Sequence, residues 1–503
     1  MASTIPQAPI HRLHGDSLAA VFYQAVRQEP SPLDEFRLLL HVTHVCREWR
    51  VVGLDLAELW GDVAFAFSMR PELFHTILGR ARSVPLLASD DMNLSVMQRQ
   101  YILDHPERFR QLQSWECTWE CAPLAGKHLP ILESAIFPIA RSGLQPEQSP
   151  LHAPILMDLS LVGGYIPFNA PNVRSLELTT RTPLQTGELI KMLRGLPKLS
   201  SLTLHESLPN EPPALRSDQL GCVELPSLHE VRLVMSCRAI ETFFQLLRPS
   251  KPDASIDLYI RQDIDVEVDI TRLAGALRPY LAGSTRDALR IRYDNVEPFI
   301  AYHHSSSSDV SCENIRNKLR LEAETWLEKP DRLCITLVEG FVESQISHLT
   351  IDPYGFNDDA DPFDWDSPAS SISQMLRMSQ IVTSLQTLIW GDHATILVSS
   401  QRLADTLRTF FQSDSSTPLP KLEELTLASV WVTSLEAVPD GDGIAWVQSW
   451  LESRARAGVP LQRLRLHKDS YHDIDGMHGC IDEAWNLVRA LVSVEVVEDS
   501  PSR

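Results

Sequence analysis

The sequence predicts an α/β protein in which a small all-helical module is followed by an irregular solenoid, or horseshoe, of stacked strand units. Two amphipathic helical patterns within residues 13–63 and a leucine pattern that recurs later in the chain carry this prediction. Composition agrees, because 44% of the 503 residues are hydrophobic, enough for an extended core. The expected parts are a flexible N-terminus (1–12), the helical module (13–63), a helical connector (64–110) and a repeat domain (111–503).

The helical module begins with apolar residues at helical spacing, among them Leu13, Leu18 and Phe22. The segment Pro30-Ser31-Pro32 should end this first helix, because proline lacks an amide hydrogen and disfavours helical backbone in the residue before it. Asp34 follows, and an acidic side chain stabilises the electropositive start of a second helix.

The second pattern places apolar residues on a single helical stripe: Val42, Val45, Cys46, Trp49 and Val52. A module of about fifty residues in short helices buries little of its own surface. We therefore expect the stripe to contact either the rest of the chain or another protein.

The order of these residues resembles the F-box, the small helical module of ubiquitin-ligase adaptors. The central family signature, Val-Cys-Arg-x-Trp-Arg, is matched by residues 45–50, and the following Leu-Trp is matched by Leu59-Trp60. The family usually has proline where this chain has His14. The match covers about a tenth of the chain and is most similar to F-box proteins of mushroom-forming fungi.

The resemblance implies a substrate-recognition adaptor that docks onto a Skp-type linker subunit and, through it, onto a cullin. Such a chain performs no bond chemistry and acts by holding its target near the conjugating enzyme. Some of the matched residues must pack inside the module, and the sequence leaves open which ones. The residues expected to bind the linker are Leu13, Leu18, Phe22, Val45, Cys46, Trp49 and Val52.

A nine-residue pattern, Leu-Pro-x-Leu-x-x-Leu-x-Leu, recurs at residues 196–204, 225–233 and 419–427, with a shorter copy at 172–178. The first copies are 26 and 29 residues apart, in the range of leucine-rich repeats, which these copies resemble. The side chain between the two strand leucines should point away from the core toward a target. These outward residues are Glu177, Thr203, Arg232, Thr426 and, in a weaker copy, Arg465.

Helices are expected between and after these strands, at residues 71–83, 95–105, 186–194, 238–247 and 444–457, with a last strand at 491–497. Loops are expected near residues 145–154, 303–309 and 352–368. The last loop holds six aspartates and no basic residue, so either a solvated loop or an acidic recognition loop fits it. An ordinary α/β domain remains the alternative to a repeat array.

The formal net charge of −21 argues against a general binder of nucleic acid or of anionic membranes. The sequence shows no apolar run of membrane-spanning length and no secretory signal pattern in its first residues. Eight cysteines are too sparse for a disulfide scaffold, so a cytoplasmic or nuclear protein with reduced thiols is expected. Cys117 and Cys121 lack a second ligand pair, and no metal or cofactor is expected.

Two other functions fit parts of the sequence. The chain could be a repeat scaffold whose helical start packs on its own domain and recruits no ligase, and exposure of the stripe around Val45 and Trp49 discriminates between the two.

A GDSL-type esterase is the other alternative, with Ser17 as nucleophile, His472 as base, Asp469 as its partner, and Gly15 and Asn357 at the oxyanion. Such a nucleophile needs a buried strand before it, which the residues ahead of Ser17 do not supply, so we expect no enzyme.

Overall fold

The computed structural model of the chain describes most of its N-terminal half and separate segments of its C-terminal half, and every structural statement below concerns these residues. They are residues 13–90, 94–114, 124–139, 149–180, 182–208, 222–249, 254–260, 270–281, 288–294, 299–303, 319–323, 347–354, 373, 376–377, 382–387, 407–411, 419–427, 442–468, 488 and 490–498.

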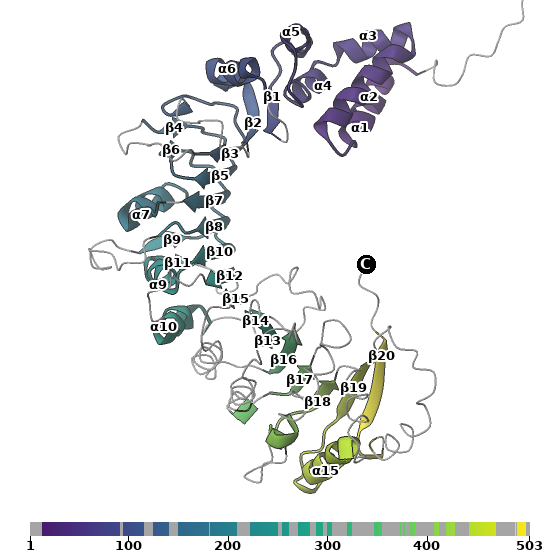
Figure 1. Cartoon of the computed structure of the whole chain (residues 1–503), viewed down its shortest axis with the longest axis vertical. Helices are drawn as coiled ribbons and strands as arrows, with labels where there is room; N and C mark the ends of the chain where they lie inside the picture. The colour runs from purple at the N-terminus through teal and green to yellow at the C-terminus, as the bar shows by residue number, and fades with distance from the viewer. Residues whose placement is uncertain are drawn as a thin grey trace, which may run out of the picture. The chain divides into compact units, whose positions relative to one another are not determined.

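The chain divides into two compact units (Figure 1). Unit 1 comprises Met1–Pro209 with Leu225–Ser227, and unit 2 comprises Asn210–Glu224 with Leu228–Arg503. None of the described helices combines the length and the apolar character that crossing a lipid bilayer requires.

Unit 1 begins with four short helices, which form the helical module: α1 (Gly15–Arg27), α2 (Pro32–Val45), α3 (Arg47–Asp55) and α4 (Ala57–Asp62). The predicted start of α2 is confirmed, because Ser31 caps it by accepting the amide hydrogen of Asp34 at 3.2 Å, with proline in the first turn. The predicted continuous stripe is wrong, since the helix breaks at Cys46.

The rest of unit 1 is a parallel sheet with helices around it. Its described strands follow the order β1-β2-β3-β5-β7-β8, and each neighbouring pair is parallel. The strands are β1 (Leu86–Asp90), β2 (Phe109–Ser114), β3 (Ser134–Pro138), β5 (Asp158–Gly163), β7 (Ser175–Thr180) and β8 (Ser201–His205), beside the short pair β4 (Leu151–His152) and β6 (Phe168–Asn169). The helices are α5 (Pro71–Ala81), α6 (Val96–Asp104), η2 (Pro106–Arg108) and α7 (Thr186–Arg194).

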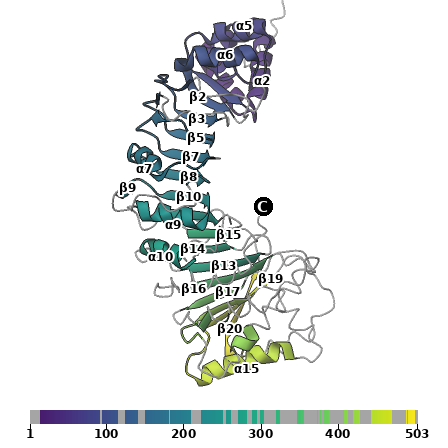
Figure 2. The ribbon, with the colours of Figure 1, turned by 60° about the vertical axis from the view of Figure 1, so that its left-hand side comes forward.

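Strict alternation of buried and more exposed residues separates the two faces of β7 and β8. In β7, Leu176 and Leu178 are buried, while Ser175 and Glu177 between and beside them are half-exposed. The leucines of β5 and β8 are buried in the same way. Helix α7 lies beside β7 and β8 (Figures 1 and 2). The opposite face of β7 and β8 carries polar residues, among them Ser175, Glu177, Ser201 and Thr203.

Unit 2 contains a mixed sheet whose described strand order is β10-β12-β15-β14-β13-β16-β17-β18-β19-β20. These strands are β10 (Glu230–Met235), β12 (Ser255–Ile260), β13 (Ala288–Asp294), β14 (Phe299–His303), β15 (Leu319–Ala323), β16 (His348–Tyr354), β17 (Ser384–Thr387), β18 (Glu424–Leu427), β19 (Arg463–Lys468) and β20 (Ser493–Glu498), beside the short β9 (Val223–Leu225) and β11 (Leu247–Pro249). The helices are α9 (Cys237–Leu246), α10 (Ile270–Leu281) and α15 (Asp442–Arg456).

The predicted leucine-rich-repeat solenoid is wrong; the structure is a mixed α/β fold with a large, mainly parallel sheet. A solenoid stacks each unit on its neighbours in sequence. Here β12 pairs with β15, and β14 runs antiparallel to both β13 and β15. The helices are also spread unevenly, with α7 between β7 and β8 but no helix in the short link from β5 to β7.

The leucine pattern nevertheless marked strands, because β7, β8, β10 and β18 each begin inside one of its four copies. The predicted helices are confirmed as α5, α6, α7, α9 and α15, and the last predicted strand as β20, with bounds shifted by a few residues. Most residues of the predicted loops lie outside the described part of the chain, although β4, β14 and β16 each reach into one of the three loops.

Candidate partner-binding surfaces

Cys46 forms a corner between two helices. Its backbone is extended (φ −156°, ψ 175°), which ends α2, and its Sγ accepts the amide hydrogen of Trp49 at 3.4 Å, which caps α3. Arg50 then ties α3 back to α2, because its Nε donates to the carbonyl oxygen of Thr43 at 3.0 Å. The matched signature, residues 45–50, is therefore a helix–corner–helix element rather than part of one long helix.

The core of the module is built where α1 and α3 meet. Leu18 and Phe22 are 1% exposed, and the Phe22 ring lies edge-on to Trp49 with 5.0 Å between ring centroids. Gly53 lets α3 lie close to α2, because a β-carbon at this position would lie only 2.9 Å from Cγ2 of Thr43. These contacts hold one side of Trp49 against the module and leave the residue half-buried.

The seven residues predicted to bind the linker divide into three groups. Leu18 and Phe22 are buried inside the module, and Val45 is 58% exposed. Leu13, Cys46, Trp49 and Val52 are half-buried.

Sequence reasoning missed two further exposed valines, Val21 (46%) and Val51 (64%). Val51 belongs to the outer face of α3 with Arg47, Glu48 and Asp55, so a helical wheel begun at residue 47 identifies it.

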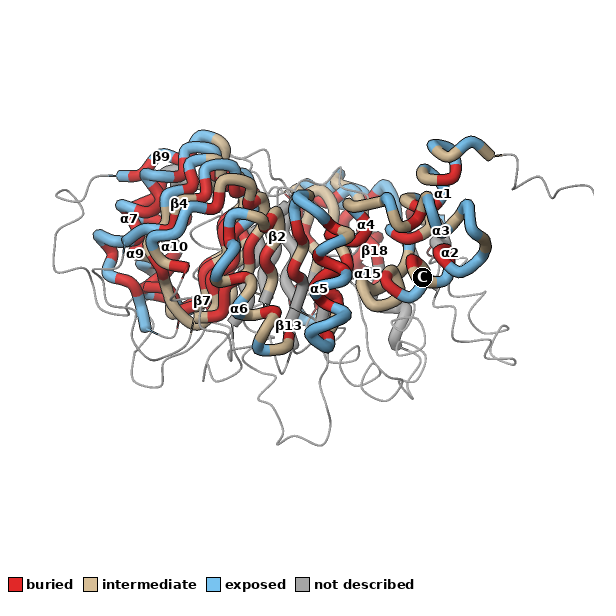
Figure 3. The backbone as a smooth tube through the Cα atoms, turned by 90° about the horizontal axis from the view of Figure 1, so that it is seen from above, coloured by how far each residue is buried: buried red, intermediate tan, exposed pale blue. Residues whose placement is uncertain are grey.

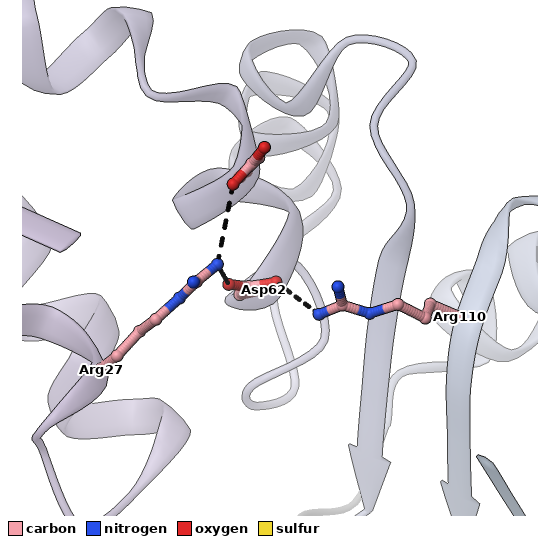
Figure 4. Close-up of polar contacts among 4 residues, drawn as sticks. Arg27, Asp62 and Arg110 are labelled. Atoms are coloured by element: carbon pink, nitrogen blue, oxygen red, sulfur yellow. Dashed lines mark hydrogen bonds and ion pairs between the residues drawn. The ribbon is translucent and has the colours of Figure 1, made fainter. Parts of the chain in front are cut away.

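A charged network joins the helical module to the sheet of unit 1 (Figure 4). Asp62 in α4 accepts from Nη2 of Arg27 in α1 at 3.1 Å, and Nη2 of Arg110 in β2 lies 4.0 Å from its other oxygen. Glu58 also lies 3.8 Å from Arg27. Gly61 packs α4 close to the edge of β1, because a β-carbon there would lie 3.0 Å from the carbonyl oxygen of Pro85.

The carboxylates of this network are partly desolvated. Burial raises the pKa of Asp62, although the hydrogen bond and charge of Arg27 and the charge of Arg110 lower it. Burial and the charge of Asp62 also raise the pKa of Glu35. The network thus links the module to the sheet, while burial of its carboxylates opposes their charged form.

The residues predicted to bind a target differ in availability. In unit 1, Glu177 and Thr203 are half-exposed on neighbouring strands, where Glu177 accepts from the Ser160 hydroxyl at 3.1 Å. In unit 2, Thr426 is only 4% exposed, and Nη1 of Arg465 lies 2.7 Å from Glu424. Arg232 is exposed and lies 4.0 Å from Asp257. Figure 3 colours the backbone by how far each residue is buried.

The residues that the structure describes bring no catalytic group together around Ser17. Ser17 is exposed in the first turn of α1, and no described strand precedes it. Asn357, Asp469 and His472 lie outside the described residues, as do Cys117 and Cys121. Within the described part of the chain, no group of three or more His, Cys, Asp or Glu side chains could hold a metal ion.

No family model matches the chain, and no curated protein matches it either.

Proposed function

We propose that this chain is a substrate-recognition adaptor of a Skp/cullin/F-box ubiquitin ligase. The helical module docks onto the Skp-type linker subunit, and the sheet domain binds the target protein. The observation that carries this proposal is the corner at Cys46, where the F-box-like signature forms a compact element with exposed Val45 on one side of the turn and exposed Val51 on the other.

These valines supply part of the energy of docking. Full burial of a valine stabilises by about 1.5 kcal/mol, so covering the exposed fractions of Val45 and Val51 contributes about 2 kcal/mol. Single exposed apolar side chains are common. In the sequence, however, they stand on either side of a half-buried tryptophan, and central aromatic residues contribute most to protein interfaces.

The alternative is a scaffold whose helical start packs only on its own domain. The back of the module does pack on the sheet of unit 1, through Gly61, Asp62 and Arg110. Val45 nevertheless remains 58% exposed, so the described part of the chain leaves the corner open to another protein. This exposure favours the adaptor over the scaffold.

The Asp62 network gives the adaptor a mechanical role. A ligase adaptor accelerates transfer by holding its target at a defined distance from the conjugating enzyme, which requires a stiff connection. Arg27 and Arg110 reach Asp62 from α1 and β2, so they hold the first helix and the sheet of unit 1 against the same carboxylate. We expect the chain itself to perform no catalysis and to need no cofactor.

The test is calorimetric titration of the purified chain with a purified Skp-type linker subunit. Trp49→Ala should weaken binding by about 2 kcal/mol or more, as loss of a central aromatic does. Val45→Asp should weaken it as well, because it places a charge in the interface.

The matched control is Val96→Asp, the same substitution at a valine that is 83% exposed in α6. It should leave the affinity unchanged. A parent chain that does not bind the linker, or a Val45→Asp variant that binds as the parent does, contradicts the proposal.

A further inference from the structure

We propose that the polar face of β5, β7 and β8 binds an extended basic segment of the target, in which two positively charged residues are separated by one residue. This inference rests on the proposed function, because it assigns a chemistry to the target that the sheet domain would hold. The polar face is defined by Asp158, Ser160, Ser175, Glu177, Ser201 and Thr203.

The strand register places these side chains in two straight rows. Asp158, Ser175 and Ser201 are direct neighbours across the three strands. Ser160, Glu177 and Thr203 form the next row on the same face, two residues further along. The intervening leucines point into the core, so the rows carry only hydroxyl and carboxylate oxygens, and among them Ser160 is only 7% exposed.

Among the residues that the structure describes, the two carboxylates of the polar face have no cationic partner. Glu177 accepts one hydrogen bond, from the hydroxyl of Ser160, and neither it nor the exposed Asp158 forms an ion pair with any residue that the structure describes. A carboxylate offers about four lone-pair sites, so most of this acceptor capacity is open. The hydroxyls of Ser175 and Thr203 are likewise free of hydrogen bonds to described residues.

The corresponding face of unit 2 is different. Glu424 lies 3.3 Å from Nη1 of Arg463 and 2.7 Å from Nη1 of Arg465, and Asp257 lies beside Arg232. These carboxylates are already neutralised within the chain. A cationic ligand would have to displace arginines there, whereas on the polar face of unit 1 it would displace no cation of the described residues.

The geometry sets the spacing of the basic residues. Asp158 and Glu177 are one strand and two residues apart, which corresponds to roughly 8 Å between their Cα atoms at standard strand spacings. Alternate residues of an extended peptide are about 7 Å apart and point the same way. A peptide with basic residues at positions i and i+2 can therefore engage both carboxylates, whereas adjacent basic residues point to opposite sides.

The experiment measures fluorescence anisotropy of the full chain with two labelled peptides of identical composition, at about 150 mM salt to suppress long-range attraction. One peptide carries arginines at positions i and i+2 between serine and threonine residues, and the other carries them at i and i+1. We expect saturable one-to-one binding of the first peptide and clearly weaker binding of the second.

The binding site is tested with the double variant Asp158→Asn/Glu177→Gln, which keeps the side-chain shapes. Loss of charge-assisted hydrogen bonds should weaken binding of the first peptide by about tenfold or more. The control, Glu107→Gln/Glu188→Gln, removes the same charge at two exposed positions away from the polar face and should change the affinity less than about twofold.

Three results would overturn the proposal: no saturable binding by the parent, equal binding of the two peptides, or equal loss in both double variants. The last would mean that the peptide senses only net charge. Titration of the same variants with the Skp-type linker separates this inference from the proposed function. Failure of the parent to bind the linker refutes the ligase role while leaving a peptide result at the polar face interpretable.

Discussion

Replacing Asp62 by asparagine should cost little stability, even though Asp62 lies at the centre of an ion-pair network. Burial raises its pKa by more than Arg27 and Arg110 lower it, so the folded environment disfavours the carboxylate relative to water. Asparagine keeps the shape and removes the penalised charge. We expect Asp62→Asn to change the free energy of unfolding by less than about 0.5 kcal/mol at neutral pH, since replacing a buried ion by a neutral group is often tolerated.

Removing the arginine should be more damaging. Arg27→Met leaves Asp62, whose side chain is 11% exposed, without the donor 3.1 Å away and with Arg110 only at 4.0 Å. A fully exposed pair contributes up to about 1 kcal/mol, and a buried charge-assisted hydrogen bond up to about 3 kcal/mol. Arg27 is half-exposed, so we expect a loss of about 1–2 kcal/mol.

The difference in stability between the parent and Asp62→Asn should depend on pH with a definite sign. The pKa of Asp62 is raised above its ordinary value of 3.8, so the folded state holds the proton more tightly than the unfolded state. The destabilisation from burying the charged Asp62 carboxylate is absent below the pKa of Asp62 in the unfolded state. It is fully present above the pKa of Asp62 in the folded state. The stability of the parent relative to Asp62→Asn should therefore fall as the pH rises from about 4 toward neutrality.

The assay is urea unfolding at several pH values, together with amide hydrogen exchange of α1 and α4 as a local measure of stability. Asp55→Asn is the matched control, because Asp55 pairs with Arg82 on the surface with a side chain that is 71% exposed, and no effect is expected. The reasoning fails if Asp62→Asn destabilises the chain more than Arg27→Met does, or if its difference from the parent does not vary with pH.

Three further predictions can be checked by the same unfolding measurements and one labelling assay. Gly53→Ala should destabilise by about 1–3 kcal/mol, because its β-carbon meets a methyl carbon at 2.9 Å, whereas Gly79→Ala, with open space around it, should stabilise by about 0.5–1 kcal/mol. Arg454→Leu should cost about 3 kcal/mol, since this buried side chain donates to two backbone carbonyls, and the exposed Arg456→Leu should cost nothing measurable. Ser17→Ala should leave ester hydrolysis at background, and a serine-directed phosphonate should not label the parent.

Local sequence patterns predicted the secondary structure better than they predicted the fold. Helices such as α7 and α9 follow from apolar periodicity, and β7 and β8 follow from alternating leucines, because both signals come from residues a few positions apart. The order of the strands depends on pairing between distant segments. The partner of β12 is β15, nearly sixty residues later, and no pattern within either strand specifies that choice.

The corner at Cys46 shows the same limit at smaller scale. Apolar residues on both sides of it fit one helical stripe, which favours an unbroken helix. A thiol that accepts the amide hydrogen of Trp49 satisfies one of the donors left free at the start of α3, and this allows a new helix to begin. Cysteine is not among the preferred capping residues, so capping rules gave no sign of the break.

Strand alternation predicts which way a side chain points, but it does not predict whether that side chain is available to a partner. Thr426 and Glu177 both stand between two core leucines of a strand, yet Thr426 is 4% exposed while Glu177 is half-exposed. Availability depends on the neighbouring strands: Arg465 is held by Glu424, whereas Glu177 lies between Ser160 and Thr203. Because small hydroxyl neighbours cannot neutralise a carboxylate, Glu177 is the member of this outward set that we expect to contact a basic target, on the polar face of unit 1.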